Sequence, residues 1–471
     1  MGLCFVFLLR TLVFASPLDE ELQKLKQAGI PATIEELNLA EIPDNENGAL
    51  VYREAFKLMD DLRQKYTKEW ESMPSFLLAP DTWETVPEEM KAKVSNLVIN
   101  DPAFNKVYQL LEKATDMECR FYPRKDYDGY VTVSGILTSK RLSDLAAFRN
   151  GERFLMSKAK IEAEKGKINQ SLATIITGFK VSRASSLDVP VIISQLVRIA
   201  MNSIVLRTLE DTNEKGMGDT ALYRILINEI EKERECPLIF SALRSEVYIY
   251  GIQMYDWQKK QAGIMNNYGK MTADDKKKMM GEMTKVYPNM PENEMRSLME
   301  NPEQLTENQE VLYLKMVRQN ISITQHPYWQ SSKEWENMEE ELKKAPEIES
   351  GMPLMLLPGI SRASLQEARN RGYLASAEIG LANCIYRQKH GEFVESLVQL
   401  TPEILPTLPL DPFTGKNYIY RKKDKGFIVY SVGDNLKDDG GVSKMRRNGK
   451  VILILSGKIA EPAYNKLKVN R

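Results

Sequence analysis

Apolar side chains recur at helical spacing along most of the chain. In residues 46–72 they stand mostly three or four positions apart, and similar spacing is found in residues 18–30, 98–118 and 361–390. This spacing places the apolar side chains of a segment on one face of a helix, where a neighbouring helix can bury them. The pattern therefore predicts a mainly α-helical protein.

The most regular helical pattern lies in residues 137–212, and residues 137–186 form its first part. One apolar stripe begins at Leu142 and ends at Ala163, and a second follows the polar run around Gly166. Glycine commonly ends a helix and lets the chain reverse. We therefore predict a tetratricopeptide-like helical hairpin, whose small residues would allow close packing: Ala159, Ala163, Ala173 and Gly178. No further repeat follows, so a solenoid of about three or more repeats is not expected.

Residues 253–303 combine many methionines with lysine and glutamate. The methionine sulfur is a ligand for Cu(I), but no histidine or cysteine lies in this segment. Methionine also packs adaptably in irregular surroundings. We therefore favour a helical excursion with adaptable packing over a copper site.

The pattern changes after residue 400, where short apolar runs replace the helical stripes. These runs predict strands at residues 417–421, 426–431 and 450–456. Two prolines and two glycines in residues 351–360 predict a linker ahead of this region. The expected fold class is mainly α with a small C-terminal α+β domain. A helical domain would occupy residues 16–350, and a long helix with a short antiparallel sheet would occupy residues 361–471.

The charge balance argues against a dedicated nucleic-acid-binding protein. The chain has 64 basic and 65 acidic residues and a formal net charge of −1, whereas such proteins normally carry a basic surface. Basic residues nevertheless outnumber acidic ones in residues 411–471. This basic end suits a protein partner with acidic groups, or contact with an anionic membrane surface. Lysines also protect the edges of sheets from aggregation, which is the simpler interpretation.

The chain begins with an apolar run that is typical of a secretory signal. Val13 and Ala15 lie three and one residues before Ser16, which is the small-residue pattern of a cleavage site. We predict a signal peptide over residues 1–15, truncated at its start because no basic residue precedes the apolar run, and hence a periplasmic or secreted protein. A cytoplasmic helical adaptor with a buried first helix is the alternative. No stretch reaches about 20 apolar residues, so we expect no transmembrane span.

No catalytic motif stands out from the sequence. The two histidines, His326 and His390, have no partner at metal-binding spacing, and both the Gly-x-Ser-x-Gly elbow and the glycine-rich phosphate loops are absent. The cysteines after the signal show neither a disulfide framework nor zinc spacing: Cys119, Cys236 and Cys384. A helical hydrolase that uses two carboxylates on a polysaccharide is an alternative, but no pair of acids stands out. The sequence favours binding or scaffolding over catalysis.

One segment has the chemistry of a cation site. Residues 431–441 hold several side-chain oxygens and three glycines that can expose their carbonyl groups. Ca²⁺ takes about six to eight oxygen ligands. The spacing is not that of an EF-hand, and Asn, Asp and Gly also favour ordinary turns. The residues alone therefore leave two interpretations, a calcium loop and a solvated turn.

The region around this loop resembles the C-terminal domain of the major pseudopilins of type II secretion systems. The similarity covers residues 373–441. It includes an Asp-Pro-aromatic-x-Gly turn, a tyrosine-rich strand, a Tyr-Ser-x-Gly strand end and an Asp/Gly loop. The residues that carry it are Tyr386, Gly391, Asp411, Pro412, Phe413, Gly415, Tyr418, Tyr420, Tyr430, Ser431, Gly433, Asp434, Gly440 and Gly441.

The resemblance implies a calcium site, with Ser431, Asp434, Asp438 and Asp439 as its ligands. Asn435 stands where the family usually has glycine, which changes the expected loop geometry. Pilin-type subunits polymerise through a long apolar helix at the start of the chain, whereas here a long helical region precedes the match. We therefore expect an exported bacterial protein that uses a pseudopilin-like module for binding or scaffolding, and not for fibre assembly.

Overall fold

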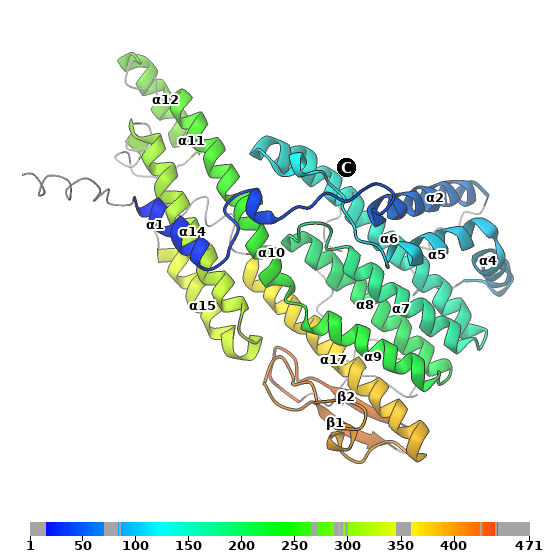
Figure 1. Ribbon diagram of the computed structural model, residues 1–471. Helices are drawn as coiled ribbons and strands as arrows, with labels where there is room; N and C mark the ends of the chain where they lie inside the picture. Colours follow the sequence, from blue (N-terminus) through cyan, green and yellow to red (C-terminus); the bar gives the residue numbers. More distant parts are fainter. Residues whose placement is uncertain are drawn as a thin grey trace, which may run out of the picture.

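The computed structural model describes residues 16–69, 83, 86–265, 271–286, 292, 295–296, 300–344, 359–423, 426–438 and 440. It is mainly helical, with one two-stranded antiparallel sheet near the C-terminal end (Figure 1), which confirms the predicted fold class. The helices are α1 (Pro17–Gln27), α2 (Gly48–Glu69), α4 (Glu88–Asn100), α5 (Pro102–Ala114), α6 (Thr138–Glu164), α7 (Ile168–Ala184), α8 (Ile192–Lys215), α9 (Thr220–Glu235), α10 (Leu238–Glu246), α11 (Gln253–Met265), α12 (Ala273–Val286), α14 (Pro302–Thr324), α15 (Tyr328–Lys344) and α17 (Ile360–His390).

Shorter elements connect these helices. Single 3₁₀ turns lie at η1 (Glu35–Leu37), η3 (Arg124–Tyr127) and η7 (Leu397–Leu400). Two turns are π-helical, η4 (Thr132–Leu137) and η5 (Val247–Ile252). The π turn η4 runs directly into α6, and η5 joins α10 to α11.

Several helices begin and end at residues with the expected chemistry. Ser16 caps α1 by accepting the Asp19 N–H, and the Asp19 carboxylate accepts the Ser16 N–H in return. Asp101 caps α5 through the N–H groups of Ala103 and Phe104, with Pro102 at the first helical position. At the other end of the chain, Gly391 ends α17 in the left-handed conformation with φ 85°.

Helices α6 and α7 form a hairpin within the residues where the sequence predicts one. Gly166 lies in the turn with φ +73°. Gly178 permits the close approach of the two helices, since a Cβ atom there would lie 2.6 Å from Glu152 Oε1 and 2.7 Å from Met156 Cε. Helix α8 packs against both members of the hairpin, and α9 packs against α7. These four helices form the centre of the body (Figure 1).

Helix α8 is the one described helix that is long and apolar enough to cross a membrane. Within the fold, 56% of its apolar window is buried, and it packs against α6, α7 and α17. It also carries buried polar side chains, among them Arg198 and Asn202. These are properties of a core helix, which agrees with the expectation that the chain has no transmembrane span.

The C-terminal segment is built into this body. Helix α17 packs along α9 and α8, and the sheet covers part of α17 (Figure 1). One apolar core extends from Leu25 to Val429 and so includes both predicted domains. The predicted linker lies outside the described residues, except for Gly359 and Ile360 at the start of α17.

The sheet consists of β1 (Ile419–Lys423) and β2 (Gly426–Tyr430), paired so that Tyr420 lies opposite Val429. Phe427 and Val429 join the main core, while Ile428 and Tyr430 form a small second cluster with Ile419. The first strand starts two residues later than predicted, and the second starts as predicted. The third predicted strand, residues 450–456, lies outside the described residues.

Helices α11 and α12 extend away from the centre of the body (Figure 1). They belong to the methionine-rich segment, in which Met254 and Met295 are buried. The sulfur of Met295 lies 3.8 Å from the Thr284 hydroxyl. Within the described ranges, no group of three or more His, Cys, Asp or Glu side chains is arranged to hold a metal ion. Met254 and Met295 therefore act in packing.

Candidate functional site

A buried carboxylate holds the turn at residues 411–415. Asp411 is 2% exposed. Its Oδ1 accepts the N–H of Phe413 and the hydroxyl of Ser431, both at 2.9 Å, and its Oδ2 accepts the N–H of Val432 at 3.2 Å. The turn is closed by a hydrogen bond from the Gly415 N–H to the Asp411 carbonyl at 2.8 Å. Asp411 therefore ties the turn to the end of β2.

This turn lies against the helical body. Gly415 has φ +67°, and a Cβ atom there would lie 2.5 Å from Cε2 of Trp329 on α15. Tyr328 meets Phe413 edge to face, with ring centres 5.7 Å apart. Glycine is therefore required at position 415 both for its backbone conformation and for its contact with the indole ring.

Three of the predicted calcium ligands are engaged by other protein groups: Ser431, Asp434 and Asp438. Ser431 donates to Asp411 and accepts the Gly433 N–H at 2.9 Å. Asp434 pairs with Arg369 of α17 at 2.8 Å. Asp439 lies outside the described residues.

Asp438 is held by three donors. Its Oδ1 accepts the Tyr430 hydroxyl at 2.6 Å and the Gly440 N–H at 2.9 Å, and its Oδ2 pairs with Arg421 at 2.8 Å. The Tyr430 hydrogen bond, followed by the Gly440 N–H and the Arg421 charge, lowers the pKa of Asp438 below its usual value. The loop thus favours the ionised carboxylate without a bound cation.

These contacts do not assemble a calcium site from the described residues. Asp434 turns toward α17 and Asp438 toward β1, where two different arginines balance their charges. A cation at this loop would have to displace Arg369 and Arg421. The calcium site therefore stays a prediction. Binding of Ca²⁺ would have to be strong enough to break the ion pairs with Arg369 and Arg421.

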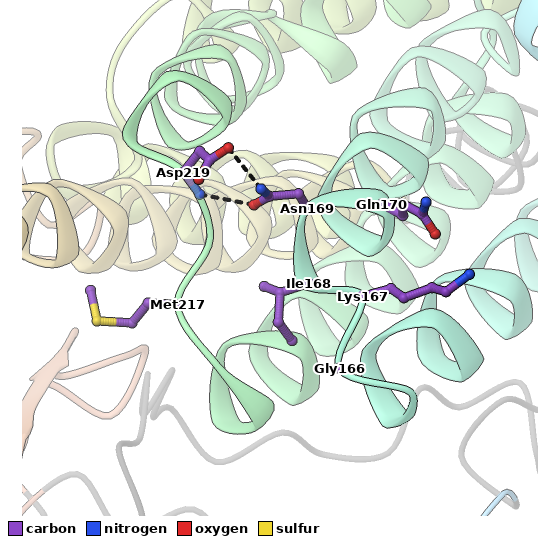
Figure 2. A pocket seen from close by; sticks show the side chains of 7 residues that line it. All are labelled: Gly166, Lys167, Ile168, Asn169, Gln170, Met217 and Asp219. Atoms are coloured by element: carbon purple, nitrogen blue, oxygen red, sulfur yellow. Dashed lines mark hydrogen bonds between the residues drawn. The ribbon is translucent and has the colours of Figure 1, made fainter.

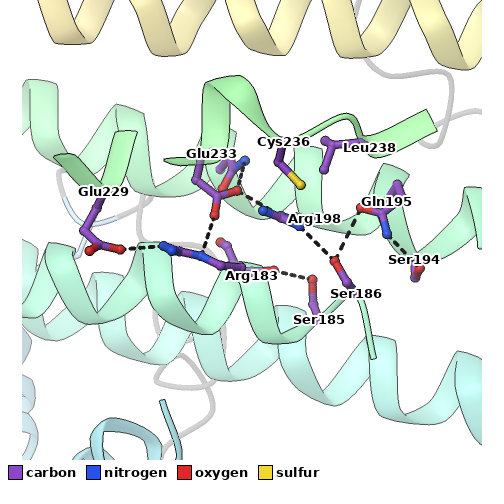
Figure 3. A network of polar contacts seen from close by, with 12 residues as sticks. Arg183, Ser185, Ser186, Ser194, Gln195, Arg198, Glu229, Glu233, Cys236 and Leu238 are labelled. Carbon is purple, nitrogen blue, oxygen red and sulfur yellow. Dashed lines mark hydrogen bonds and ion pairs between the residues drawn. The ribbon is translucent and has the colours of Figure 1, made fainter. Parts of the chain in front are cut away.

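A second polar cluster is buried between α7, α8 and α9 (Figure 3). Glu233 is fully buried and accepts Arg198 Nε at 2.9 Å, Asn202 Nδ2 at 3.2 Å and Arg183 Nε at 3.1 Å. Arg183 also pairs with Glu229 at 2.5 Å. Glu229 also pairs with the partly exposed Lys232 at 2.7 Å. We call Arg183, Arg198, Glu229 and Glu233 the balanced cluster, because each of these arginines pairs with a carboxylate of the cluster.

One nearby carboxylate has no cation partner in the described part of the chain. Glu152 is fully buried beside Gly178 and accepts the Ser182 hydroxyl at 3.4 Å. Burial raises the pKa of Glu152 well above its usual value, and the negative charge of Glu233 adds to this rise. Glu152 therefore favours its protonated form, so that it adds no negative charge beside the carboxylates of Glu229 and Glu233.

A third polar cluster surrounds Arg141 near the start of α6. Arg141 is fully buried, and its Nη1 donates to the Val189 carbonyl at 2.6 Å. Its guanidinium carbon lies 5.7 Å from the centre of the Tyr122 ring. Nε–H and Nη2–H lie on one edge of the guanidinium, and neither has an acceptor among the described residues.

The carboxylates near Arg141 bind other groups. Asp188 accepts the N–H groups of Phe121 and Tyr122 at 2.6 and 2.7 Å, and the Tyr127 hydroxyl at 3.2 Å. Burial raises the pKa of Asp188, although these N–H groups offset part of the rise.

Two further carboxylates complete the surroundings. Asp144 accepts the Tyr122 hydroxyl at 2.8 Å and pairs with Arg53 at 3.2 Å. Glu246 accepts the Ile192 N–H at the start of α8 at 2.7 Å. Burial raises the pKa of Glu246 to about 7, against the Ile192 N–H and the Arg141 charge, which lower it.

The backbone around Arg141 has three uncommon features. Arg141 follows the π turn η4, and Glu246 directly precedes the π turn η5, which packs against η4. Single π turns within helices are often found at functional sites. Leu187, next to Asp188, has φ 61°, which is unfavourable for a branched side chain.

The sequence pattern assigned the wrong residue to the core here. Leu142 was expected in the buried stripe but is 50% exposed, while its neighbour Arg141 is 0% exposed. Arg141 lies four residues after Leu137 and four before Leu145, both buried. Spacing alone would have placed it on the buried face, but an arginine there was not expected.

An open hollow of about 320 Å³ lies at the end of the bundle between two interhelical turns (Figure 2). Asn169 and Asp219 exchange two hydrogen bonds across it, at 2.7 and 2.9 Å. The other lining residues are Gly166, Lys167, Ile168, Gln170 and Met217. This lining contains neither a nucleophile beside a base nor a pair of free carboxylates.

The fold and these clusters define a helical protein with a built-in C-terminal α+β module. Comparison with known proteins gives no match: no family model, no curated protein and no solved structure is similar to this chain.

Proposed function

We propose that this is an extracytoplasmic binding or scaffolding protein in which a pseudopilin-like module is fixed to a helical body. The observation that carries the proposal is the docking of the module. Helix α17 packs along α8 and α9, and the turn at Gly415 lies on Trp329. A module held in this way displays its hairpin and acidic loop while its helix is occupied in the core.

The module exposes apolar side chains that suit a protein partner. Val398 and Leu436 are each 63% exposed, and Leu410 is 55% exposed. The described cations of β1 are less available, because Lys422 pairs with Glu392 at 3.0 Å and Arg421 pairs with Asp438. An anionic membrane surface would have to compete with these acids, so within the proposal a protein partner is favoured over a membrane.

The beginning of α1 supports export. The proposed cleavage falls directly before Ser16, which is the N-cap of α1. After cleavage the new ammonium group would lie at the present Ser16 nitrogen, 3.1 Å from the Asp19 carboxylate. The mature chain would therefore begin with a complete helix cap and a paired terminal charge.

Export is tested by expressing the full chain in a bacterium, separating the cell fractions and determining the N-terminus by mass spectrometry. We expect a chain that starts at Ser16 in the periplasm or medium. Ala15→Arg is the matched variant that should block cleavage, because the cleavage site requires a small residue. An uncleaved wild-type chain confined to the cytoplasm would instead support the cytoplasmic adaptor.

Partner binding is tested with a photo-crosslinking amino acid at Leu436 on the acidic loop. The same amino acid at Leu142, an exposed leucine of the helical body, is the control. We expect a crosslinked protein from position 436 and none from position 142. Equal yields at both positions would argue against a binding role for the module.

Calcium binding at the acidic loop is part of the proposal. A specific ligand of the folded state must raise the thermal midpoint, so the midpoint of the full chain is measured in EDTA and then in excess Ca²⁺. We expect a rise that is lost in Asp434→Ala and Asp438→Ala and kept in Asp60→Ala, an exposed carboxylate elsewhere. No rise would mean that Arg369 and Arg421 are the only cations that serve this loop.

A further inference from the structure

Arg141 has an unused hydrogen-bonding edge. A buried arginine normally directs its donors at carboxylates or carbonyls, because an unpaired buried charge is costly. Here Nη1 has the Val189 carbonyl, but Nε–H and Nη2–H have no acceptor in the described part of the protein. These two donors are parallel and match the two oxygens of a carboxylate.

We infer that Arg141 forms a binding site for a small monoanionic carboxylate, whose two oxygens accept hydrogen bonds from Nε–H and Nη2–H. We call these two parallel donors the fork. The Tyr122 ring, 5.7 Å from the guanidinium carbon, fixes the plane of the fork. The Val189 carbonyl holds the opposite side of the guanidinium at 2.6 Å. The fork is thus oriented before any ligand arrives, which lowers the entropy cost of binding.

The surrounding charges select a single negative charge. Asp144 is paired with Arg53. Asp188 is held by two N–H groups and a tyrosine hydroxyl, and its charge is offset by Arg120 at 4.0 Å. Arg141 is then the one nearby cation without a short-range anionic partner among the described residues. A dianion such as phosphate would add a charge that nothing at this site balances, so a monocarboxylate fits better.

The nearby carboxylate of Glu246 leaves the two donors of Arg141 open to a ligand. Its Oε1 accepts the Ile192 N–H, and it feels the Arg141 charge without forming an ion pair with it. Glu246 therefore does not occupy the fork. Both residues flank π turns that pack on each other, where the local helical hydrogen bonding is already altered.

The proposal is tested by titrating sodium acetate into the full chain, with sodium chloride at equal ionic strength as the reference. The thermal midpoint and the heat of binding are both measured. We expect a saturable rise of the midpoint in acetate over chloride. Arg141→Lys keeps the charge but loses the fork, and should weaken the apparent affinity by about tenfold or more.

Arg53→Lys is the matched control, because Arg53 also lies near the Tyr122 ring but is partly exposed and paired. It should bind acetate as the wild type does. Inorganic phosphate should give no saturable rise. The inference is overturned if acetate and chloride give the same midpoint, or if the acetate effect is unsaturated and equal in Arg141→Lys. Either result would assign the two donors to internal water molecules.

Discussion

The two clusters of buried arginine differ in how their charges are balanced. In the balanced cluster, Arg198 reaches Glu233 and the Ser186 hydroxyl, and Arg183 reaches Glu229 and Glu233. At the start of α6, Arg141 reaches one carbonyl and leaves an edge unpaired within the described residues. The comparison shows that burial of a charge does not reveal its role. Complete pairing joins helices, whereas incomplete pairing leaves capacity for a ligand.

The balanced cluster should respond most strongly to the loss of one carboxylate. Glu233→Gln leaves Arg198 and Arg183 short of an anion in a buried site, and breaking such a pair costs about 3–5 kcal/mol. The free energy of unfolding is measured by urea denaturation at neutral pH. Glu235→Gln, at an exposed carboxylate two residues away, should change it by less than about 1 kcal/mol. Similar losses in both variants would show that the cluster contributes little beyond surface charge.

The Asp411 turn should respond next most strongly. Asp411→Ala removes the acceptor of the Phe413 and Val432 N–H groups and of the Ser431 hydroxyl. Leaving buried donors unpaired costs about 1–3 kcal/mol, and we expect the upper part of this range. Asp434→Ala, which breaks the more exposed pair with Arg369, should cost about 1 kcal/mol or less. Urea denaturation of both variants measures the difference, and the reverse order would contradict the role of Asp411.

The C-terminal module shows what the sequence could predict. The turn, the hairpin and the end of α17 at Gly391 follow from local signals: Asp-Pro, glycines with positive φ, and alternating apolar residues. The docking of Gly415 on Trp329 joins residues far apart in the chain. No local sequence pattern predicts that contact. The sequence therefore indicated a C-terminal module behind a linker, whereas in the structure the module shares one apolar core with the helical body.

The candidate sites were harder to predict for the same reason. The acidic loop is visible in the sequence because its oxygens are close together along the chain. Its neutralisation by Arg369 and Arg421 depends on where α17 and β1 pass. Arg141 is a single arginine on a helix, and it is buried only because η4, α7 and α8 pack against α6.

The cluster around Arg141 should also make the stability depend on pH, through Glu246. The pKa of Glu246 is raised to about 7 by burial, so the folded state holds a proton that the unfolded chain releases at about pH 4.3. This contribution to stability is full below about pH 4.3 and is lost as the pH rises toward 7. Its size is on the order of 3–4 kcal/mol, at about 1.4 kcal/mol per pKa unit.

Urea denaturation from pH 4 to 8 measures this loss, and Glu246→Gln should remove part of the slope. Glu378, whose pKa burial also raises to about 7 in spite of Arg234, should contribute in the same direction. Glu378→Gln therefore distinguishes the two carboxyl groups, because each variant should remove only that group's contribution to the slope of the unfolding free energy against pH. A slope unchanged in Glu246→Gln would mean that this carboxylate is ionised in the folded state.

The smallest effect provides the sharpest comparison between the two arginines. Arg141→Met loses one hydrogen bond, but it also removes the desolvation cost of a buried cation without an anionic partner in the described part of the chain. We expect a change of about 1 kcal/mol or less in chloride buffer, toward greater stability. Arg198→Met removes an equally buried cation from Glu233 and should cost about 3 kcal/mol or more. If both variants lose the same free energy in urea denaturation, Arg141 is paired in the folded protein and the distinction between the two clusters fails.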